Sequence, residues 1–288
     1  GNMKVKISTD DGATWSGEIQ GVYDVVTPYF TSIIGLTTLT KAPYAGRIVA
    51  SLWRDQYNVS GSGQAGVAYS DDNGATWTDW IAATNGFTQE SFSAGAVVEL
   101  PSGDLLLPIE GTNTGTAIIN RSSHTVLSTD GGATWGSEVT IRNYATDSRP
   151  YYETCLLLLD TGELIAIHRT SDSAKRHYIS RSTDQGATTG GWGAPTSAFD
   201  GWGKPNTIQV GSLGLICTTR SASSSDTVAF TSVDRGLTWS SEIAVDAAMY
   251  ESEYACPVQL LNNNVLVVEG YQSTSSINDS DIIRVTLS

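Results

Sequence analysis

Short apolar runs come in pairs along this chain, and a tight polar turn joins the two runs of each pair. One pair comprises residues 154–159 and 164–168, which flank an Asp-Thr-Gly-Glu turn. The runs are rich in leucine and β-branched residues and alternate little, which is typical of strands buried on both faces. No segment keeps a helical period. The pattern predicts an all-β protein with hairpins at 31–53, 92–110, 154–168, 207–218 and 258–268.

A second pattern, Ser-x-Asp-x-Gly-x-Thr-Trp, alternates with these hairpins. It begins at residue 128 and recurs with starts at 8, 70, 182 and 232. In the copy at 182, Thr189 stands at the Trp position and Trp192 follows shortly after. Ser and Asp side chains hydrogen-bond to the backbone ahead of them and close a turn, while Gly supplies a conformation that other residues avoid. Each copy is therefore predicted to be a turn between two strands, covered by its Trp.

The two patterns together define a repeating unit, because successive starts are 62, 58, 54 and 50 residues apart. Such a period indicates an array of one supersecondary structure. Each unit holds a hairpin, a third strand leading into the turn and a fourth strand after it, which is the four-stranded antiparallel blade of a β-propeller. Five hairpins and five turns predict a five-bladed ring in which the N-terminal segment completes the last blade. A single domain then spans residues 1–288.

The repeated turn resembles the Asp-box, or BNR repeat, of sialidases and related propeller proteins. That resemblance implies that the turns lie on the rim of the propeller, away from the active site. It also implies six blades, as the alternative to five. We interpret the aspartates of these turns as structural, and we expect neither a metal site nor a cofactor.

Charge and cysteine content narrow the function further. Charged residues make up 16% of the chain and the net charge is −14, so binding to nucleic acid is not expected and an anionic ligand requires cations gathered locally. Cys155, Cys217 and Cys256 each lie in an apolar run without zinc-type spacing, which predicts core residues. No run is long enough to cross a membrane and no signal peptide is recognisable. The location stays open; an extracellular protein whose signal lies outside these residues is compatible.

Candidate chemistry lies at the ends of the hairpin strands. In a propeller blade, the start of the innermost strand and the end of the second strand share the face opposite the repeated turns, and the scarce charges gather there. Arg54, Arg169 and Arg220 each end a second strand, and converging guanidinium groups bind carboxylates. The further candidates for substrate binding at or beside such positions are Glu90, Tyr152, Trp202 and Lys204.

Two stretches sharpen the resemblance to sialidases. Residues 152–169 resemble the blade that opens with the catalytic glutamate and closes with an arginine of the substrate-binding triad, which implies these roles for Glu153 and Arg169. Residues 253–260 resemble the segment with the nucleophilic tyrosine, which implies that role for Tyr254.

Other parts of the family pattern match less closely. Arg220 resembles a further triad arginine. The opening Arg-Ile-Pro motif, which supplies the first arginine, is absent, and Tyr29-Phe30-Thr31 stands nearest to its place. Asp55 is the candidate for the acid/base aspartate.

Charge also explains the catalytic pair that the resemblance implies. Sialic acid carries a carboxylate on its anomeric carbon and repels a carboxylate nucleophile, so a tyrosine with a glutamate base serves instead. We therefore predict a sialidase-like exo-glycoside hydrolase acting on a glycan or small sugar, with neither nucleic acid nor membrane as partner. One alternative is a non-catalytic carbohydrate-binding propeller. The other is a glycoside hydrolase that uses an Asp/Glu pair, with candidates Glu90, Glu110, Glu153 and Glu253.

Overall fold

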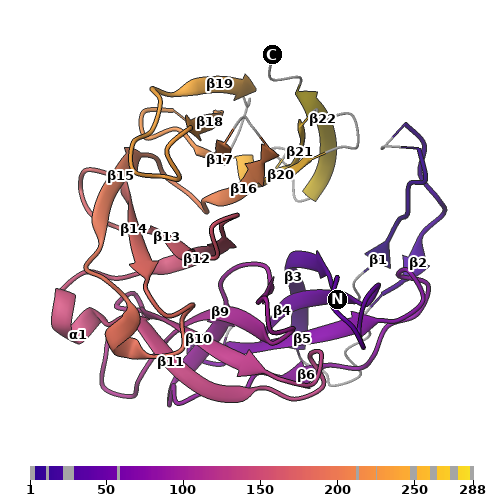
Figure 1. Ribbon diagram of the computed structural model, residues 1–288, viewed down its shortest axis with the longest axis horizontal. Helices are drawn as coiled ribbons and strands as arrows, with labels where there is room; N and C mark the ends of the chain where they lie inside the picture. Colours follow the sequence, from indigo (N-terminus) through magenta and orange to yellow (C-terminus); the bar gives the residue numbers. More distant parts are fainter. Residues whose placement is uncertain are drawn as a thin grey trace. The chain divides into compact units, whose positions relative to one another are not determined.

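The computed structural model describes residues 4–10, 13–21, 29–56, 59–211, 214–224, 226–246, 252–259, 265–272 and 278–285. Nearly all regular structure in these residues is β-strand (Figure 1). Internal contacts divide the chain into two compact units, and each is described by itself. Unit 1 comprises Gly1–Tyr151 and Asp184–Gly191, and unit 2 comprises Tyr152–Thr183 and Trp192–Ser288.

Unit 1 contains three antiparallel sheets. A two-stranded sheet pairs β1 (Lys4–Val5) with β2 (Ile19–Gln20). The second sheet has the order β3 (Tyr29–Thr38), β4 (Ile48–Gln56), β5 (Gln64–Ser70) and β6 (Ile81–Ala82). The third has the order β11 (Gly136–Arg142), β10 (Ser122–Ser128), β9 (Leu105–Thr112) and β7 (Glu90–Ser93), with β8 (Val98–Glu99) also paired to β9. Two short helices complete the unit, α1 (Tyr144–Asp147) and the 3-10 helix η1 (Thr189–Gly191).

Unit 2 also contains three antiparallel sheets. The first has the order β12 (Tyr152–Leu158), β13 (Leu164–Arg169), β14 (Arg176–Ser182) and β15 (Thr196–Asp200). The second has the order β16 (Asn206–Val210), β17 (Gly214–Arg220), β18 (Thr227–Ser232) and β19 (Ile243–Asp246). The third joins β20 (Ser252–Gln259), β21 (Val265–Gln272) and β22 (Asn278–Val285).

Neighbouring sheets within each unit bury their apolar side chains against one another. In unit 1, Val49 and Val67 of one sheet share a cluster with Leu107 of the next. In unit 2, Ile167 and Leu215 do the same for the first two sheets. The second strands β9 and β13 are buried along almost their whole length, so both of their faces are covered and the sequence there shows little alternation.

The predicted hairpins are present, with two differences. Residues 92–100 do not form one strand, because the chain leaves the sheet after Ser93 to pack Ala96 against Gly35, where an added Cβ would lie 2.6 Å from that of Ala96. Cys256 is exposed rather than part of the core. It alternates along β20 with the buried Ala255 and Pro257, so its side chain points to the other face of the strand.

The repeated turns close with a common set of hydrogen bonds. In the copy at 128, the carboxylate of Asp130 accepts from the Thr134 amide at 2.8 Å and from its hydroxyl at 2.6 Å. The Ser128 hydroxyl donates to Asp130 and accepts from the Gly132 amide, and Gly132 has a φ of +92°. The same bonds recur in the copies at 70 and 232. The turn is therefore held by its own side chains, with the Asp carboxylate engaged on both oxygens.

The tryptophans of these turns are not all alike. The indoles of Trp77 and Trp135 donate to the glycine carbonyl of their own turn, at 3.1 Å and 3.0 Å. Trp192, the displaced residue of the fourth copy, is buried beside Ser182. Trp15 is 43% exposed, and its turn connects the two short strands β1 and β2. Trp77 and Trp135 thus make equivalent contacts, whereas the buried indole N–H groups of Trp192 and Trp239 have no hydrogen-bond partner among the described residues.

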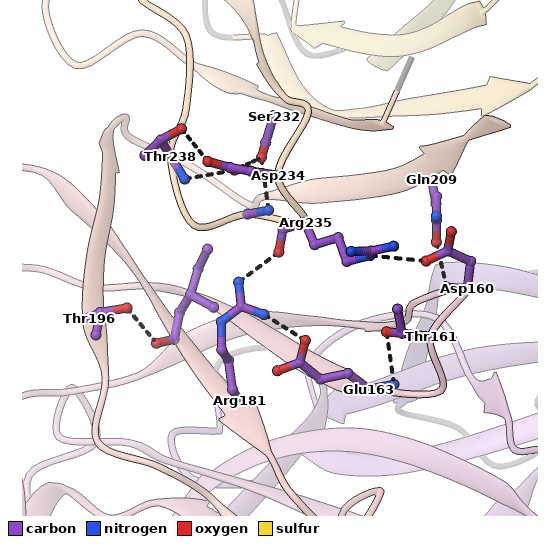
Figure 2. A network of polar contacts seen from close by, with 12 residues as sticks. Asp160, Thr161, Glu163, Arg181, Thr196, Gln209, Ser232, Asp234, Arg235 and Thr238 are labelled. Carbon is purple, nitrogen blue, oxygen red and sulfur yellow. Dashed lines mark hydrogen bonds and ion pairs between the residues drawn. The ribbon is translucent and has the colours of Figure 1, made fainter. Parts of the chain in front are cut away.

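In unit 2, an arginine network ties the turn ends of neighbouring sheets together (Figure 2). Arg181 of β14 forms an ion pair with Glu163 at 2.9 Å and donates to the carbonyl of Arg235, which belongs to the repeated turn of the next sheet. Arg235 in turn reaches Asp160 in the β12–β13 turn at 3.3 Å. Unit 1 contains a similar contact from Arg47 to the carbonyl of Gly131. This end of the blades is occupied by contacts between sheets.

Candidate functional site

The opposite strand ends of unit 2 hold the residues that the sequence singles out. Tyr152 at the start of β12 pairs with Arg169 at the end of β13, and the register then shifts before Cys155. Glu153 lies in this bulge at a φ of +44°, a conformation that non-glycine residues seldom adopt. Its carboxylate forms an ion pair with Arg169 at 2.7 Å, and the two side chains are 16% and 23% exposed. The bulge therefore presents Glu153 at a partly open strand end.

A buried chain of hydrogen bonds supports the Glu153–Arg169 pair from behind. The Thr154 hydroxyl lies 2.8 Å from Nδ1 of His168, and Nε2 of His168 lies 3.2 Å from the Ser180 hydroxyl. All three side chains are fully buried. Thr154 follows Glu153 and His168 precedes Arg169, so these bonds fix both strands next to the ion pair.

The backbone of β20 repeats the geometry of β12. Its register with β21 shifts between Glu253 and Cys256, as that of β12 shifts between Tyr152 and Cys155. Tyr254 therefore occupies the bulge position that Glu153 holds in β12. The side chain of Tyr254 lies outside the described residues, and its distance from Glu153 stays a prediction.

Trp202 is the centre of a group of cations in unit 2. The guanidinium carbon of Arg169 lies 5.0 Å from the ring centroid, and the ammonium of Lys175 lies 5.5 Å from it. Arg220 at the end of β17 donates from Nε to the Trp202 carbonyl at 3.1 Å, and the backbone carbonyl of Arg220 accepts from the Trp202 amide at 2.8 Å. The sequence pattern does not indicate Lys175, because Lys175 lies in the loop before the third strand, β14, and not at a strand end that flanks a hairpin.

Two buried basic side chains lie near this group. His177 is fully buried and its Nε2 lies 2.9 Å from the Gly203 carbonyl. Burial lowers its pKa to about 4, and the positive charge of Arg169 contributes. Lys204, a predicted substrate contact, is only 4% exposed. Burial raises the pKa of the Cys155 thiol, and the Lys204 ammonium opposes that shift, so Lys204 lies near this core cysteine.

Unit 1 holds a second set of charges at strand ends. Arg121 bridges Glu90 at 3.0 Å and Glu110 at 2.6 Å, and its guanidinium lies over the Phe92 ring at 4.3 Å. The two carboxylate side chains are 4% and 2% exposed. Burial raises the pKa of Glu90, although Arg121 opposes the shift. Arg121 was also missed from the sequence, because it too precedes a third strand.

The other predicted residues of unit 1 are held by local contacts. The Asp55 carboxylate accepts from the Gln56 amide at 2.8 Å and from the Ser62 hydroxyl. Its negative charge contributes to the raised pKa of Glu90, so the two carboxyl groups are neighbours. Arg54 donates to Gln64 at 2.9 Å and lies over the Trp80 ring. Arg54 thus belongs to unit 1, whereas Arg169 and Arg220 belong to unit 2.

The described residues contain no group of three or more His, Cys, Asp or Glu side chains placed to hold a metal ion. In the same part of the chain, no helix has the length and apolar character needed to span a membrane.

Comparisons with known proteins agree on the family. The family model described as BNR repeat-like domain matches residues 3–200. A sialidase of Paraclostridium sordellii is 24% identical over 198 residues, which cover 63% of this chain and 47% of the relative. An anhydrosialidase of Macrobdella decora is 29% identical over 154 residues, which cover 51% of this chain and 18% of the relative. The chain thus spans less than half the length of these curated relatives.

Solved structures show the same fold at low identity. An α-L-arabinofuranosidase of Fusarium graminearum has a TM-score of 0.76 at 15% identity, covering 98% of this chain and 85% of its own. An α-L-arabinanase of Penicillium chrysogenum has a TM-score of 0.74 at 16% identity, with coverages of 99% and 85%. A sialidase of Trypanosoma rangeli has a TM-score of 0.72 at 15% identity, with coverages of 98% and 49%. The predicted fold class is confirmed as an all-β propeller.

Proposed function

We propose that this chain, which belongs to the family of BNR repeat-like domains, is a sialidase-like exo-glycoside hydrolase that acts on glycan termini. The observation that carries the proposal is the repeated bulge, which gives Glu153 and Tyr254 equivalent positions at the starts of β12 and β20. Two of the compared relatives bear the names sialidase and anhydrosialidase, which supports the same activity.

The proposed chemistry follows from the two side chains. A tyrosine with a pKa near 10 is a weak nucleophile at neutral pH and requires a base in contact. Glu153 takes the phenolic proton of Tyr254, and the phenolate attacks the anomeric carbon to form a glycosyl-enzyme that water then hydrolyses. Arg169 balances the charge of Glu153 at 2.7 Å before the proton moves. The predicted acid for the leaving oxygen, Asp55, belongs to unit 1, and its role stays a prediction.

A neutral sugar is the second candidate substrate, and one observation in unit 1 favours it. Neighbouring carboxyl groups whose settings separate their pKa values can serve as acid and base. Burial raises the pKa of Glu90, and the negative charge of the neighbouring Asp55 adds to that shift. In this version Glu90 is the protonated acid, and Tyr254 has no catalytic role.

The propeller is proposed to have five blades. Three described sheets have four strands, and a fourth sheet adds the short β8 to four. The sheet of β20, β21 and β22 has three strands in the described residues and is the fifth of these blades.

The decisive experiment compares Tyr254→Phe and Glu153→Gln with the unaltered protein on aryl sialosides and on neutral aryl glycosides. Removing the nucleophile or its base lowers kcat on sialosides by about 100-fold or more. Glu163→Gln is the matched control, because Glu163 forms a similar ion pair with Arg181 at the opposite end of the same hairpin. If the unaltered protein turns over neither substrate yet binds glycans, and both variants bind equally well, the chain is a carbohydrate-binding propeller instead.

A further inference from the structure

Most described arginines form ion pairs with carboxylates, but two of the three cations around Trp202 do not. The chain has a net charge of −14, and seven described arginines form ion pairs with carboxylates. Arg169 is one of them, because Glu153 neutralises it at 2.7 Å. It therefore contributes little net positive charge to the site.

Lys175 and Arg220 differ from this pattern. Within the described residues, neither forms an ion pair. The Lys175 ammonium donates to the carbonyl of Ala222 at 2.9 Å, and Arg220 donates from Nε to the carbonyl of Trp202 at 3.1 Å. These carbonyls orient the two cations without cancelling their charge. The acid closest in sequence to Lys175, Asp172, accepts instead from the Arg176 amide and the Tyr178 hydroxyl.

The backbone holds Lys175 beside the Trp202 loop. The Gly201 amide donates to the Lys175 carbonyl at 2.7 Å, and the Lys175 amide donates to the Asp172 carbonyl at 3.0 Å. Lys175 itself has a φ of +49°, a left-handed conformation that a surrounding loop must impose on a residue with a Cβ. The fold therefore sets the position of this exposed ammonium group.

We infer that Lys175 is a specificity-determining residue which, together with Arg220, binds the carboxylate of an anionic terminal sugar. The inference rests on the proposed function and names its substrate class. Glu153 forms an ion pair with Arg169, so Lys175 and Arg220 add positive charge that no carboxylate of the described residues pairs with. Arg220 supplies a planar fork that suits a carboxylate, and Lys175 adds a compact point charge.

Kinetic measurements test this role directly. Lys175→Gln is expected to raise KM for an aryl sialoside about tenfold, the usual worth of one charge-assisted hydrogen bond, with little change in kcat. KM for neutral aryl glycosides stays unchanged, and Lys175→Arg retains most of the affinity. Lys41→Gln is the matched control, because Lys41 is an exposed lysine in unit 1 and the substitution changes the net charge equally. An equal rise in KM for both substrate types overturns the inference.

A binding measurement separates this inference from the catalytic proposal. In the Tyr254→Phe background, sialic acid and its methyl ester are titrated by calorimetry with and without Lys175→Gln. The acid should bind about tenfold tighter than the ester, and Lys175→Gln should remove most of that difference. Equal affinity for acid and ester in the Tyr254→Phe protein refutes the role of Lys175. Full turnover by Tyr254→Phe refutes the proposed nucleophile alone, because the preference for the acid still tests Lys175.

Discussion

Arg121 in unit 1 and Arg169 in unit 2 both pair with glutamates at strand ends, yet their surroundings differ. Arg121 bridges two carboxylates that are 4% and 2% exposed, so the cluster carries a net negative charge when both are ionised. Arg169 pairs with the single carboxylate of Glu153, which is 16% exposed, and Lys175 is another cation over the same Trp202 ring. The first group has more carboxylates than cations, and the second has more cations than carboxylates.

This contrast shows that burial and charge count decide what an Arg–Glu pair can do. In unit 1, burial disfavours the charged form of Glu90 and raises its pKa, which suits a packed ion cluster or a protonated acid. In unit 2, the Glu153–Arg169 pair is partly open, so its carboxylate is accessible at the strand end. The same two residue types thus fit a proton donor in one unit and an anion site in the other.

The largest expected effect comes from removing the arginine of unit 1. Arg121→Met leaves two buried carboxylates without a counter-charge and is expected to lower the free energy of unfolding by about 3–5 kcal/mol at pH 7. The loss should shrink at pH 4, because the raised pKa of Glu90 favours its protonated form as the pH falls. Urea denaturation at both pH values measures the difference.

The matched variant is Arg169→Met in unit 2. Its pair is partly exposed, so the expected loss is about 1 kcal/mol. Equal losses for the two variants would contradict the view that the units differ in burial and charge count.

The sequence predicts the regular part of this molecule well and its loops poorly. The hairpin of β12 and β13 follows from apolar runs around a polar turn, and that regularity places Glu153 and Arg169 at one strand end. Lys175 and Arg121 escaped prediction because each precedes a third strand, where loop conformation rather than strand period sets the direction of the side chain. The break after Ser93 was also missed, since it depends on the close approach of a neighbouring sheet.

The pH dependence of stability should have opposite signs in the two units. His177 in unit 2 has an unfolded pKa of 6.5 and a folded pKa of about 4, so the unfolded chain takes up the proton first as pH falls. Its contribution is full above pH 6.5 and is lost on acidification through pH 4, by about 3 kcal/mol in total. Glu90 in unit 1 acts oppositely, because its raised pKa gives a contribution that is full below 4.5 and lost as pH rises.

His177→Gln isolates the histidine contribution, since glutamine keeps a donor for the Gly203 carbonyl but does not titrate in this range. The difference in unfolding free energy between the variant and the unaltered protein is measured from pH 7 to pH 4. A difference that stays constant over this range means that the pKa of His177 is the same in the folded and the unfolded state. The predicted difference in pH dependence between the two units would then be wrong.

The repeated turns provide a reference that both units share. Asp130 in unit 1 and Asp234 in unit 2 accept the same bonds from the Thr four residues later and from the Ser two residues earlier. Asp130→Ala leaves the turn donors without their acceptor and is expected to cost about 2 kcal/mol of stability. Asp234→Ala should lower the melting temperature in the same direction. Neither change should alter glycan binding by the folded protein, because both carboxylates are engaged within their own turns, and in unit 2 the Asp234 turn lies at the end of β17 opposite Arg220. Loss of binding at an unchanged melting temperature would place the site on the face of the turns and remove both arginine clusters from consideration.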